Sequence, residues 1–235
     1  MTAILVTRPD GDADPVVDAL KVVGYRVHAV PTVATQPLDF DRPDLSRYDW
    51  VVVTSAAGVA SLAELSAGPR WAAVGLATAR ALRNRDVEPE LVPDEASGLA
   101  LASAMPDMRG KRVLLVRASA AASDLPERLR ERGAAVDELA AYLTVEGPAT
   151  AAEPLKLALA DIDLAAIVFA SGSAVRGYIA LGGTTAWPAI TIGPRTTTVA
   201  RQCGFRVIAE AERQSAAALV AAVVHAIPVE ERNHA

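Results

Sequence analysis

The chain has 235 residues, of which 51% are hydrophobic and 22% charged, a balance typical of a globular protein and not of a disordered chain. Its net charge of −5 argues against nucleic acid as a partner, because phosphate binding needs a basic surface, although a locally positive cleft can still bind a small anion. The longest strongly apolar stretch, 216–227, is too short to cross a membrane, and the N-terminal MTAILVTRP is typical of a first strand rather than of a signal peptide.

Short β-branched runs alternate along the chain with alanine-rich segments of helical periodicity. In chain order, strands are predicted at 3–7, 26–30, 50–54, 71–74, 112–116, 136–141, 164–170, 189–192 and 205–208, and helices at 14–23, 56–65, 77–85, 97–104, 123–132, 153–159, 173–180, 195–202 and 216–225. Several strands are apolar at every position, as expected when helices cover both faces of a sheet. The alternation predicts an α/β fold with parallel sheets, and the segments 31–43 and 142–154 are predicted to be linkers.

The sequence contains an internal duplication. Residues 4–30 align without a gap with residues 113–139, at an offset of 109, which places Arg8 over Arg117 at the end of a strand. A second pair of segments carries the matched residues Ser55 and Ser171, Gly75 and Gly193, and Thr78 and Thr196. The repeats follow one another in the order A, B, A, B, which predicts two similar α/β units.

Motifs of several enzyme classes are missing from the sequence. It has no G-x-G-x-x-G after the first strand, no G-x-x-x-x-G-K-[ST], no H-E-x-x-H and no paired cysteines, which disfavours a dehydrogenase, a kinase or a zinc hydrolase. The lone Cys203 excludes an internal disulfide, predicts a reducing cytoplasm and is expected to have a packing role. His28, His225 and His234 are scattered, without partners at metal-ligand spacing, and are expected to be structural or solvated.

A hydroxyl residue recurs where a strand ends and a helix begins. Ser55 and Ser171 directly follow predicted strands, and Thr78 and Thr196 follow the dipeptides VG and IG by two residues. One interpretation is that these residues are helix N-caps. The other is that they line an anion site, because helix N-termini bind carboxylates and phosphates and ligands of open α/β sheets lie at the carboxyl ends of the strands. The sequence leaves both interpretations open.

Arg8 and Arg117 lie at the same carboxyl edge of their predicted sheets. An arginine at this place is either a solvated surface residue or a bidentate clamp for a carboxylate.

Together, these runs resemble a known family. The segments that carry the resemblance are ILVTRP, YDWVVVTSAAGV, AAVGLATARAL, KRVLLVRA, YLT at 142–144, IVFASGSAV and TIGPRTTTVA, in this order over nearly the whole chain. They resemble uroporphyrinogen-III synthase. The resemblance implies a cofactor-independent and metal-independent lyase that closes linear hydroxymethylbilane to uroporphyrinogen III, with loss of water and inversion of ring D.

The resemblance also implies an architecture. It predicts two flavodoxin-like parallel-sheet domains, interleaved in sequence and joined by a two-stranded linker, with the substrate in the cleft between them. Transferred to this chain, domain 1 would comprise 1–33 plus 147–235 and domain 2 would comprise 38–140, with linkers at about 34–37 and 141–146.

Site residues follow from the same resemblance. Tyr142 matches a tyrosine proposed to assist departure of the hydroxyl group, although a tyrosine at a strand end is otherwise commonly a packing residue. The predicted substrate-binding residues are Arg8, Ser55, Thr78, Arg117, Ser171, Ser173, Gly193, Thr196 and Thr197. The chain departs from the family pattern at Leu76, Gly172 and Arg195, and Arg195 either adds a carboxylate contact or points outward.

The expected partner is a small octacarboxylate substrate, with a transient contact to the enzyme that supplies hydroxymethylbilane. The protein is predicted to be a cytoplasmic monomer that binds neither nucleic acid nor membrane. The leading alternative is a non-catalytic tetrapyrrole- or anion-binding sensor of the same fold, since a fold does not fix a function. No effector-like segment is seen beyond residue 227, which favours the enzyme. A nucleotide-sugar transferase would need a longer chain and an acidic metal or ribose site.

Overall fold

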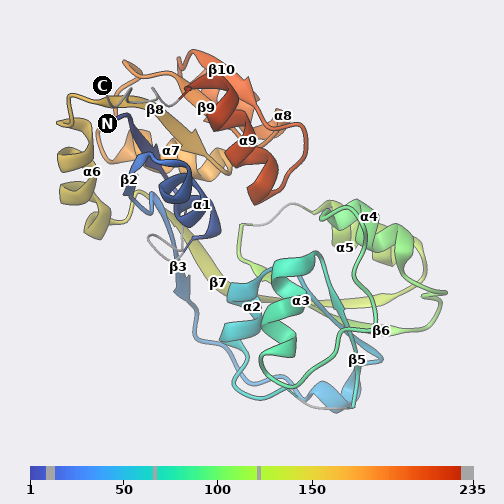
Figure 1. Ribbon diagram of the computed structural model, residues 1–235. Coiled ribbons are helices and arrows are strands. Elements are labelled where there is room, and N and C mark those ends of the chain that lie inside the picture. The colour runs from blue at the N-terminus through green and yellow to red at the C-terminus, as the bar shows by residue number, and fades with distance from the viewer. Residues whose placement is uncertain (9–13, 66–67, 121–122, 229–235) are drawn as a thin grey trace. The chain divides into compact units, whose positions relative to one another are not determined.

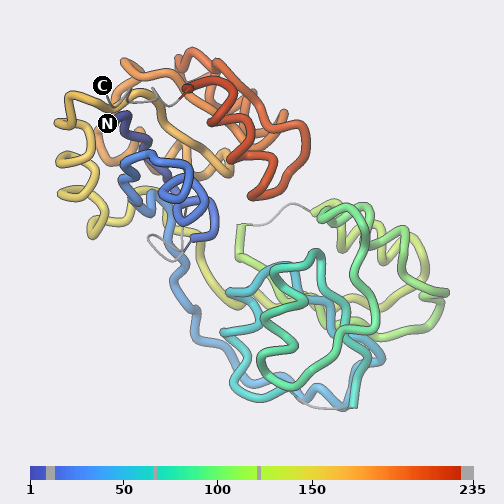
Figure 2. Tube along the Cα trace, in the orientation of Figure 1, coloured from blue at the N-terminus to red at the C-terminus, as the bar shows by residue number. Residues whose placement is uncertain are grey.

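The computed structural model describes residues 1–8, 14–65, 68–120 and 123–228. The chain separates into two compact units, of which unit 1 comprises Met1–Ala34 and Val145–Ala235 and unit 2 comprises Thr35–Thr144. In unit 1 the N-terminal segment therefore lies beside the part of the chain that follows Val145 (Figure 2).

Unit 1 contains a five-stranded sheet with helices on both faces (Figure 1). Its elements are β1 (Ala3–Val6), α1 (Pro15–Val23), β2 (Arg26–Ala29), the short 3-10 helix η3 (Ala149–Ala151), α6 (Ala152–Leu159), β8 (Leu164–Phe169), α7 (Gly172–Ala180), β9 (Ala189–Thr191), α8 (Pro194–Gln202), β10 (Val207–Glu210) and α9 (Ala216–Ala226). The strand order is β10-β9-β8-β1-β2, and the neighbouring strands are parallel. This is the flavodoxin-like order, in which the chain changes direction across the sheet between β1 and β8.

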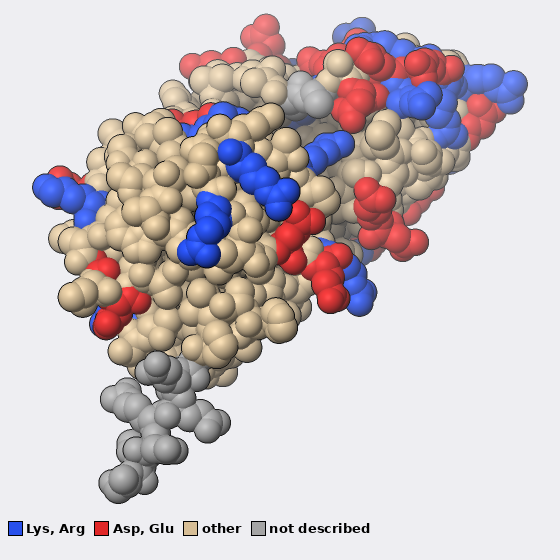
Figure 3. Space-filling view, turned by 90° about the horizontal axis from the view of Figure 1, so that it is seen from above, with Lys and Arg blue, Asp and Glu red and all other residues tan. Residues whose placement is uncertain are grey.

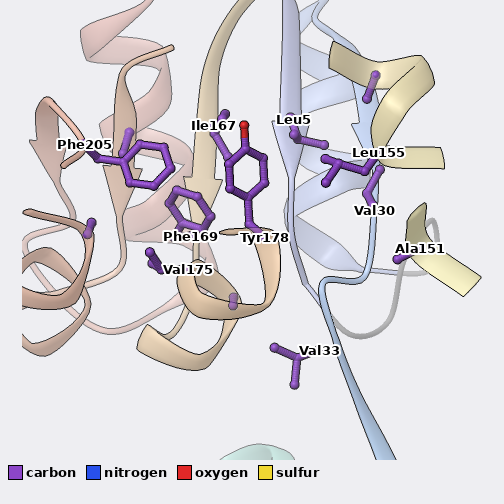
Figure 4. Packing of buried hydrophobic residues seen from close by; sticks show 14 of the residues in the cluster. Leu5, Val30, Val33, Ala151, Leu155, Ile167, Phe169, Val175, Tyr178 and Phe205 are labelled. Carbon is purple, nitrogen blue, oxygen red and sulfur yellow. The ribbon is translucent and has the colours of Figure 1, made fainter. Parts of the chain in front are cut away.

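Alternate residues of the central strands of unit 1 enter two separate hydrophobic clusters. Leu5, Ile167 and Phe169 pack against α6, α7 and α8, whereas Ile4 and Val168 pack against α1 and α9. In the first cluster the rings of Phe169, Tyr178 and Phe205 meet edge to face or tilted (Figure 4). Burial raises the pKa of Tyr178 to about 12, and its hydroxyl donates to the carbonyl of Thr184 over 2.8 Å, so this tyrosine is a structural one.

Unit 2 has the same core arrangement. Its elements are β3 (Val33–Pro37), the short 3-10 helix η2 (Leu45–Arg47), β4 (Trp50–Val53), α2 (Ala56–Ser61), β5 (Arg70–Ala73), α3 (Leu76–Arg83), α4 (Gly98–Ala104), β6 (Arg112–Ala118), α5 (Asp124–Glu131) and β7 (Ala135–Glu146). The sheet order is β3-β7-β6-β4-β5, with β4, β5, β6 and β7 in parallel pairs. Strands β6, β7, β4 and β5 therefore take the places of β1, β2, β8 and β9, as the A, B, A, B duplication predicts.

The helices of unit 2 also divide between the two faces of its sheet. Val51 and Val53 pack with α2 and α3, and Trp50 and Val52 pack with α4 and α5. Tyr142 of β7 belongs to the first of these clusters. The predicted fold class, two flavodoxin-like α/β units interleaved in sequence and joined by two strands, is confirmed.

Two predicted linkers contain regular structure that sequence patterning missed. Strand β3 lies inside 31–43, and β7 extends to Glu146 instead of ending at Ala141. These two strands are neighbours in the sheet, and both continue across the boundary between the units. None of the helices in the described ranges is long and apolar enough to cross a membrane.

Candidate active site

The two predicted serines lie at equivalent helix starts. Ser55 is the N-cap of α2 and its Oγ accepts the Gly58 N–H over 3.0 Å, and Ser171 is the N-cap of α7 and accepts the Ala174 N–H over 3.1 Å. Both have extended backbones, which place the hydroxyl over the first helical turn. The N-cap interpretation is therefore confirmed for the serines.

The N-cap interpretation is wrong for the two threonines. The caps of α3 and α8 are Gly75 and Gly193, whose carbonyls accept the first helical hydrogen bonds at 3.0 Å, and Thr78 and Thr196 stand at the third helical position. At Gly75 a side chain has no room, because an added Cβ would lie 2.9 Å from the Cβ of Ala96. In both helices the N-cap is therefore a glycine, and the threonine lies in the first turn of the helix.

The hydroxyls of Thr78 and Thr196 are not used by the fold. The two residues are only 3% and 5% exposed, respectively, yet among the residues that the structure describes neither hydroxyl has a hydrogen-bond partner. In the described residues no buried side-chain oxygen lacks a hydrogen-bond partner, so these two hydroxyls are reached by solvent although the rest of each residue is covered. Each is therefore available to a bound molecule.

Thr196 lines a cavity of about 240 Å³ at the carboxyl edge of the unit 1 sheet. The N-termini of α7 and α8 both border this cavity, through Gly172 and Gly193. Arg195 also lines it, and this exposed guanidinium has no ion-pair partner in the described part of the chain. The full lining consists of Ala170, Ser171, Gly172, Ile192, Gly193, Arg195, Thr196 and Gln214. Hydroxyl, guanidinium and helix N-terminal donors gathered in one hollow suit a carboxylate.

Thr197 and Ser173 differ from Thr196 because their hydroxyls are engaged. The hydroxyls of Thr197 and Thr191 lie 2.6 Å apart, and Thr197 donates to the carboxylate of Glu210. The Ser173 hydroxyl lies 2.9 Å from the hydroxyl of Ser171. Thr197 therefore holds α8 to the strands β9 and β10, and it is not among the residues that line the cavity.

Both predicted arginines have a carboxylate partner in their own unit. Arg8 donates to Asp14, the fully buried N-cap residue of α1. Arg117 is only 6% exposed and donates to Glu138 over 2.8 Å. The interpretation of Arg117 as a solvated surface residue is therefore wrong, because its guanidinium is enclosed and paired.

Tyr142 meets Ser55 at the carboxyl edge of the unit 2 sheet. The Tyr142 hydroxyl lies 2.7 Å from Ser55 Oγ, and its side chain is packed in the hydrophobic cluster beneath α2 and α3. The Tyr142 carbonyl accepts the Ser119 N–H over 3.0 Å, which fixes the backbone at this point. Tyr142 is thus a buried residue whose hydroxyl end reaches the predicted site.

His28, His225 and Cys203 are not among the residues that line the unit 1 cavity. His28 contacts Asp161 at 2.6 Å, and hydrogen bonds from His28, from the Asp163 N–H and from Arg26 lower the pKa of Asp161 to about 2. Cys203 is partly buried against the core of unit 1, in agreement with a packing role, and His234 lies outside the described residues.

Charged residues do not gather into a metal site in the part of the chain that is described. Within those ranges no three His, Cys, Asp or Glu side chains come together in a way that could hold a metal ion. On the face seen in Figure 3, positive and negative side chains lie among one another over much of the charged surface.

Comparison with known proteins decides the family. The family model for uroporphyrinogen-III synthase HemD matches residues 14–221, which is most of the chain. The chain belongs to the uroporphyrinogen-III synthase family. A uroporphyrinogen-III synthase from Chlorobaculum parvum is 26% identical over 226 residues, covering 88% of this chain and 92% of that protein. The porphyrin biosynthesis protein HemD of Ruminiclostridium josui is 26% identical over 89% of this chain, which spans 46% of that longer protein.

Solved structures of uroporphyrinogen-III synthases share the fold. The enzyme from Helicobacter pylori is similar with a TM-score of 0.70 at 17% identity, covering 96% of this chain and 99% of that one. A mutant of the Thermus thermophilus enzyme gives a TM-score of 0.61 at 21% identity, over 96% of this chain and 98% of that one. The family places this chain among the enzymes of tetrapyrrole synthesis.

Sequence reasoning missed two features of this uroporphyrinogen-III synthase family member. Gln214 lines the unit 1 cavity from the loop after β10, and no motif marks it. The contact between Ser55 and Tyr142 joins residues 87 positions apart. Placing Tyr142 in a strand beside β6, rather than in a linker, would have brought it to the same sheet edge as Ser55.

Proposed function

We propose that the protein is a uroporphyrinogen-III synthase that cyclises hydroxymethylbilane to uroporphyrinogen III, with loss of water and inversion of ring D. The observation that carries this proposal is the set of uncommitted donors at the carboxyl edges of the sheets, in a chain of this family. The reaction removes one water from the substrate and requires no oxidant or reductant. Its difficulty is steering, because a flexible octacarboxylate must be held in one conformation while the last ring attacks a substituted carbon.

The unit 1 cavity suits one carboxylate side chain of this substrate. Its volume of about 240 Å³ is smaller than the roughly 300–1,000 Å³ of pockets that enclose a whole drug-sized ligand. Thr196 donates its free hydroxyl, Arg195 adds the positive charge, and the first-turn N–H groups of α8 complete the donor set. Thr78 offers the equivalent hydroxyl in unit 2.

Other predicted binding residues act less directly. Arg8, Arg117 and Thr197 already pair with acidic side chains of their own units, so their role is to hold the sheet edges in shape. Ser171 and Gly193 form the wall of the cavity. The direct contacts in unit 1 are therefore assigned to Thr196, Arg195 and the backbone.

Tyr142 supplies the proton that the leaving hydroxyl needs. The pyrrole nitrogen pushes its electron pair toward the hydroxymethyl carbon, the C–O bond breaks with its electrons going to oxygen, and the Tyr142 proton converts the departing hydroxide to water. The resulting azafulvene cation is attacked by the substituted carbon of the last ring, which gives a spiro intermediate. After this intermediate opens and closes with the ring inverted, the closing carbon loses a proton, which returns to Tyr142.

The test is to incubate the protein with freshly made hydroxymethylbilane, oxidise the products and separate the type I and type III isomers. Formation of the type III isomer, faster than spontaneous closure gives type I, is the expected result. Only type I at the spontaneous rate would exclude the enzyme, and tight binding without turnover would assign the protein to the sensor class. We further infer from its single cysteine that the protein acts in a reducing cytoplasm, and we propose separately that it is a monomer.

A further inference from the structure

We propose that Ser55 is a positioning residue that directs the proton of Tyr142 toward the substrate, an inference that rests on the proposed role of Tyr142. The observation is a chain of hydrogen bonds within unit 2, from the Gly58 N–H to Ser55 Oγ over 3.0 Å and between Ser55 Oγ and the Tyr142 hydroxyl over 2.7 Å. Ser55 was predicted to bind substrate, whereas the structure places its hydroxyl against the proposed acid.

The direction of this chain decides what Tyr142 can do. The Gly58 N–H can only donate, so Ser55 Oγ accepts it and keeps one proton of its own. When Ser55 donates that proton to the Tyr142 oxygen, the phenolic proton points away from Ser55 and is free to move to a leaving hydroxyl. When Tyr142 gives its proton away, the Ser55 O–H remains as a donor to the phenolate, and a hydrogen bond to a charged partner is stronger than one to a neutral partner.

The ring and the backbone of Tyr142 are held by their surroundings, so the main motion left to this residue is rotation of its hydroxyl group. Tyr142 is only 7% exposed, and its side chain packs within the hydrophobic cluster that includes Val53 and Val59. Its backbone is held by pairing with β6 and by the Ser119 N–H. Ser55 is therefore the side chain that sets where the proton points.

The duplicated unit provides an internal comparison. Ser171 is the same kind of cap as Ser55 and accepts a first-turn N–H in the same way. The stretch 113–139 that aligns with 4–30 ends before Tyr142, so unit 1 has no residue aligned with this tyrosine. Ser171 instead contacts Ser173. The fold therefore needs only the cap, and the tyrosine contact is a separate feature of unit 2.

The experiment measures kcat and KM, with hydroxymethylbilane, for Ser55→Ala, Ser55→Thr, Tyr142→Phe and the double variant Ser55→Ala with Tyr142→Phe. The control is Ser97→Ala, because Ser97 is the N-cap of α4 in the same unit and accepts the Ala100 N–H over 3.1 Å. It removes a cap of the same kind without touching Tyr142. Urea unfolding of each variant checks that it is folded.

We expect Ser55→Ala to lower kcat about three- to tenfold with little change in KM, because the variant loses one hydrogen bond to the Tyr142 hydroxyl. Ser55→Thr restores kcat, because threonine keeps both the cap and the donor. The double variant has the same kcat as Tyr142→Phe alone, since Ser55 acts through the hydroxyl that is already missing. Ser97→Ala keeps the kcat of the wild type.

Three results overturn the proposal. Multiplied losses in the double variant would make Ser55 a direct substrate contact, and an equal loss of kcat in Ser97→Ala would make its effect that of a helix cap. A Tyr142→Phe variant with wild-type kcat would leave Ser55 nothing to position. Failure of the wild type to form the type III isomer would instead reject the proposed function as a whole, which separates the two failures.

Discussion

Two adjacent threonines of α8 allow the carboxylate cavity to be tested with one kind of substitution. Thr196 and Thr197 are each 5% exposed, and replacing either by valine exchanges a hydroxyl for a methyl group of similar size. The Thr196 hydroxyl faces the cavity without a partner in the described chain, whereas the Thr197 hydroxyl joins Thr191 and Glu210. The two variants should therefore fail in different ways.

The expected magnitudes follow from these contacts. Thr196→Val breaks no internal hydrogen bond, so the free energy of unfolding should stay within about 0.5 kcal/mol of the wild type. It removes one hydrogen bond to a charged carboxylate, worth about 1.5 kcal/mol, which corresponds to roughly a tenfold rise in KM. Thr197→Val leaves the buried Thr191 hydroxyl without its partner and should lower the free energy of unfolding by about 1–3 kcal/mol.

The assay combines urea unfolding, followed by circular dichroism, with initial rates at several hydroxymethylbilane concentrations. A Thr196→Val variant with normal stability and raised KM supports the cavity as a carboxylate site. The reasoning is refuted if Thr196→Val has the KM of the wild type, or if it loses as much stability as Thr197→Val.

Three further predictions concern other contacts. Tyr142→Phe should lower kcat at least tenfold without a comparable rise in KM. If the turnover of this variant is unchanged, Tyr142 has no part in the mechanism. Because the pKa of Asp161 is lowered to about 2, its stabilising charge is present above pH 4 and is lost as the pH falls toward 2. Asp161→Asn should therefore lower the free energy of unfolding by about 1–2 kcal/mol at pH 6. If the difference between variant and wild type is as large near pH 2 as at pH 6, the prediction is contradicted. Arg132→Met should lower the free energy of unfolding, measured in urea, by about 1–3 kcal/mol, because Arg132 donates to the carbonyls of Ala102, Met105 and Pro106 at the end of α4. The control is Arg128→Met, at an exposed arginine. A smaller loss of stability in Arg132→Met than in this control would contradict the prediction.

The fold could be predicted because its signals are local. Strands such as β4 and β8 are apolar at nearly every position, and the glycine stop after α1 recurs after α5 at the repeat offset. Strand β3 was expected only from the family resemblance, as part of the two-stranded linker, and its own residue pattern did not predict it. Its residues VATQP are mostly exposed and end in proline, so its regularity comes from its position next to β7 at the sheet edge and not from its own composition.

The site was only partly predictable. The position of the hydroxyl residues at strand ends is visible in the sequence, but the distinction between a cap and a first-turn residue depends on a distant neighbour, because Ala96 excludes a side chain at Gly75. Likewise, nothing local distinguishes Thr196 from Thr197, whose partner Glu210 arrives from β10. The pairing of Ser55 with Tyr142 requires the sheet order itself, since Ser55 follows β4 and Tyr142 lies in β7, with β6 between these two strands.

The most direct test of the central claim is the isomer composition of the product as a function of protein concentration. Hydroxymethylbilane is allowed to react at a fixed starting concentration with increasing amounts of the protein, and the oxidised uroporphyrins are separated. The account predicts that the type III fraction rises with protein concentration until little type I remains, and that Tyr142→Phe needs more protein to reach the same fraction. A product that stays type I at every protein concentration would contradict it.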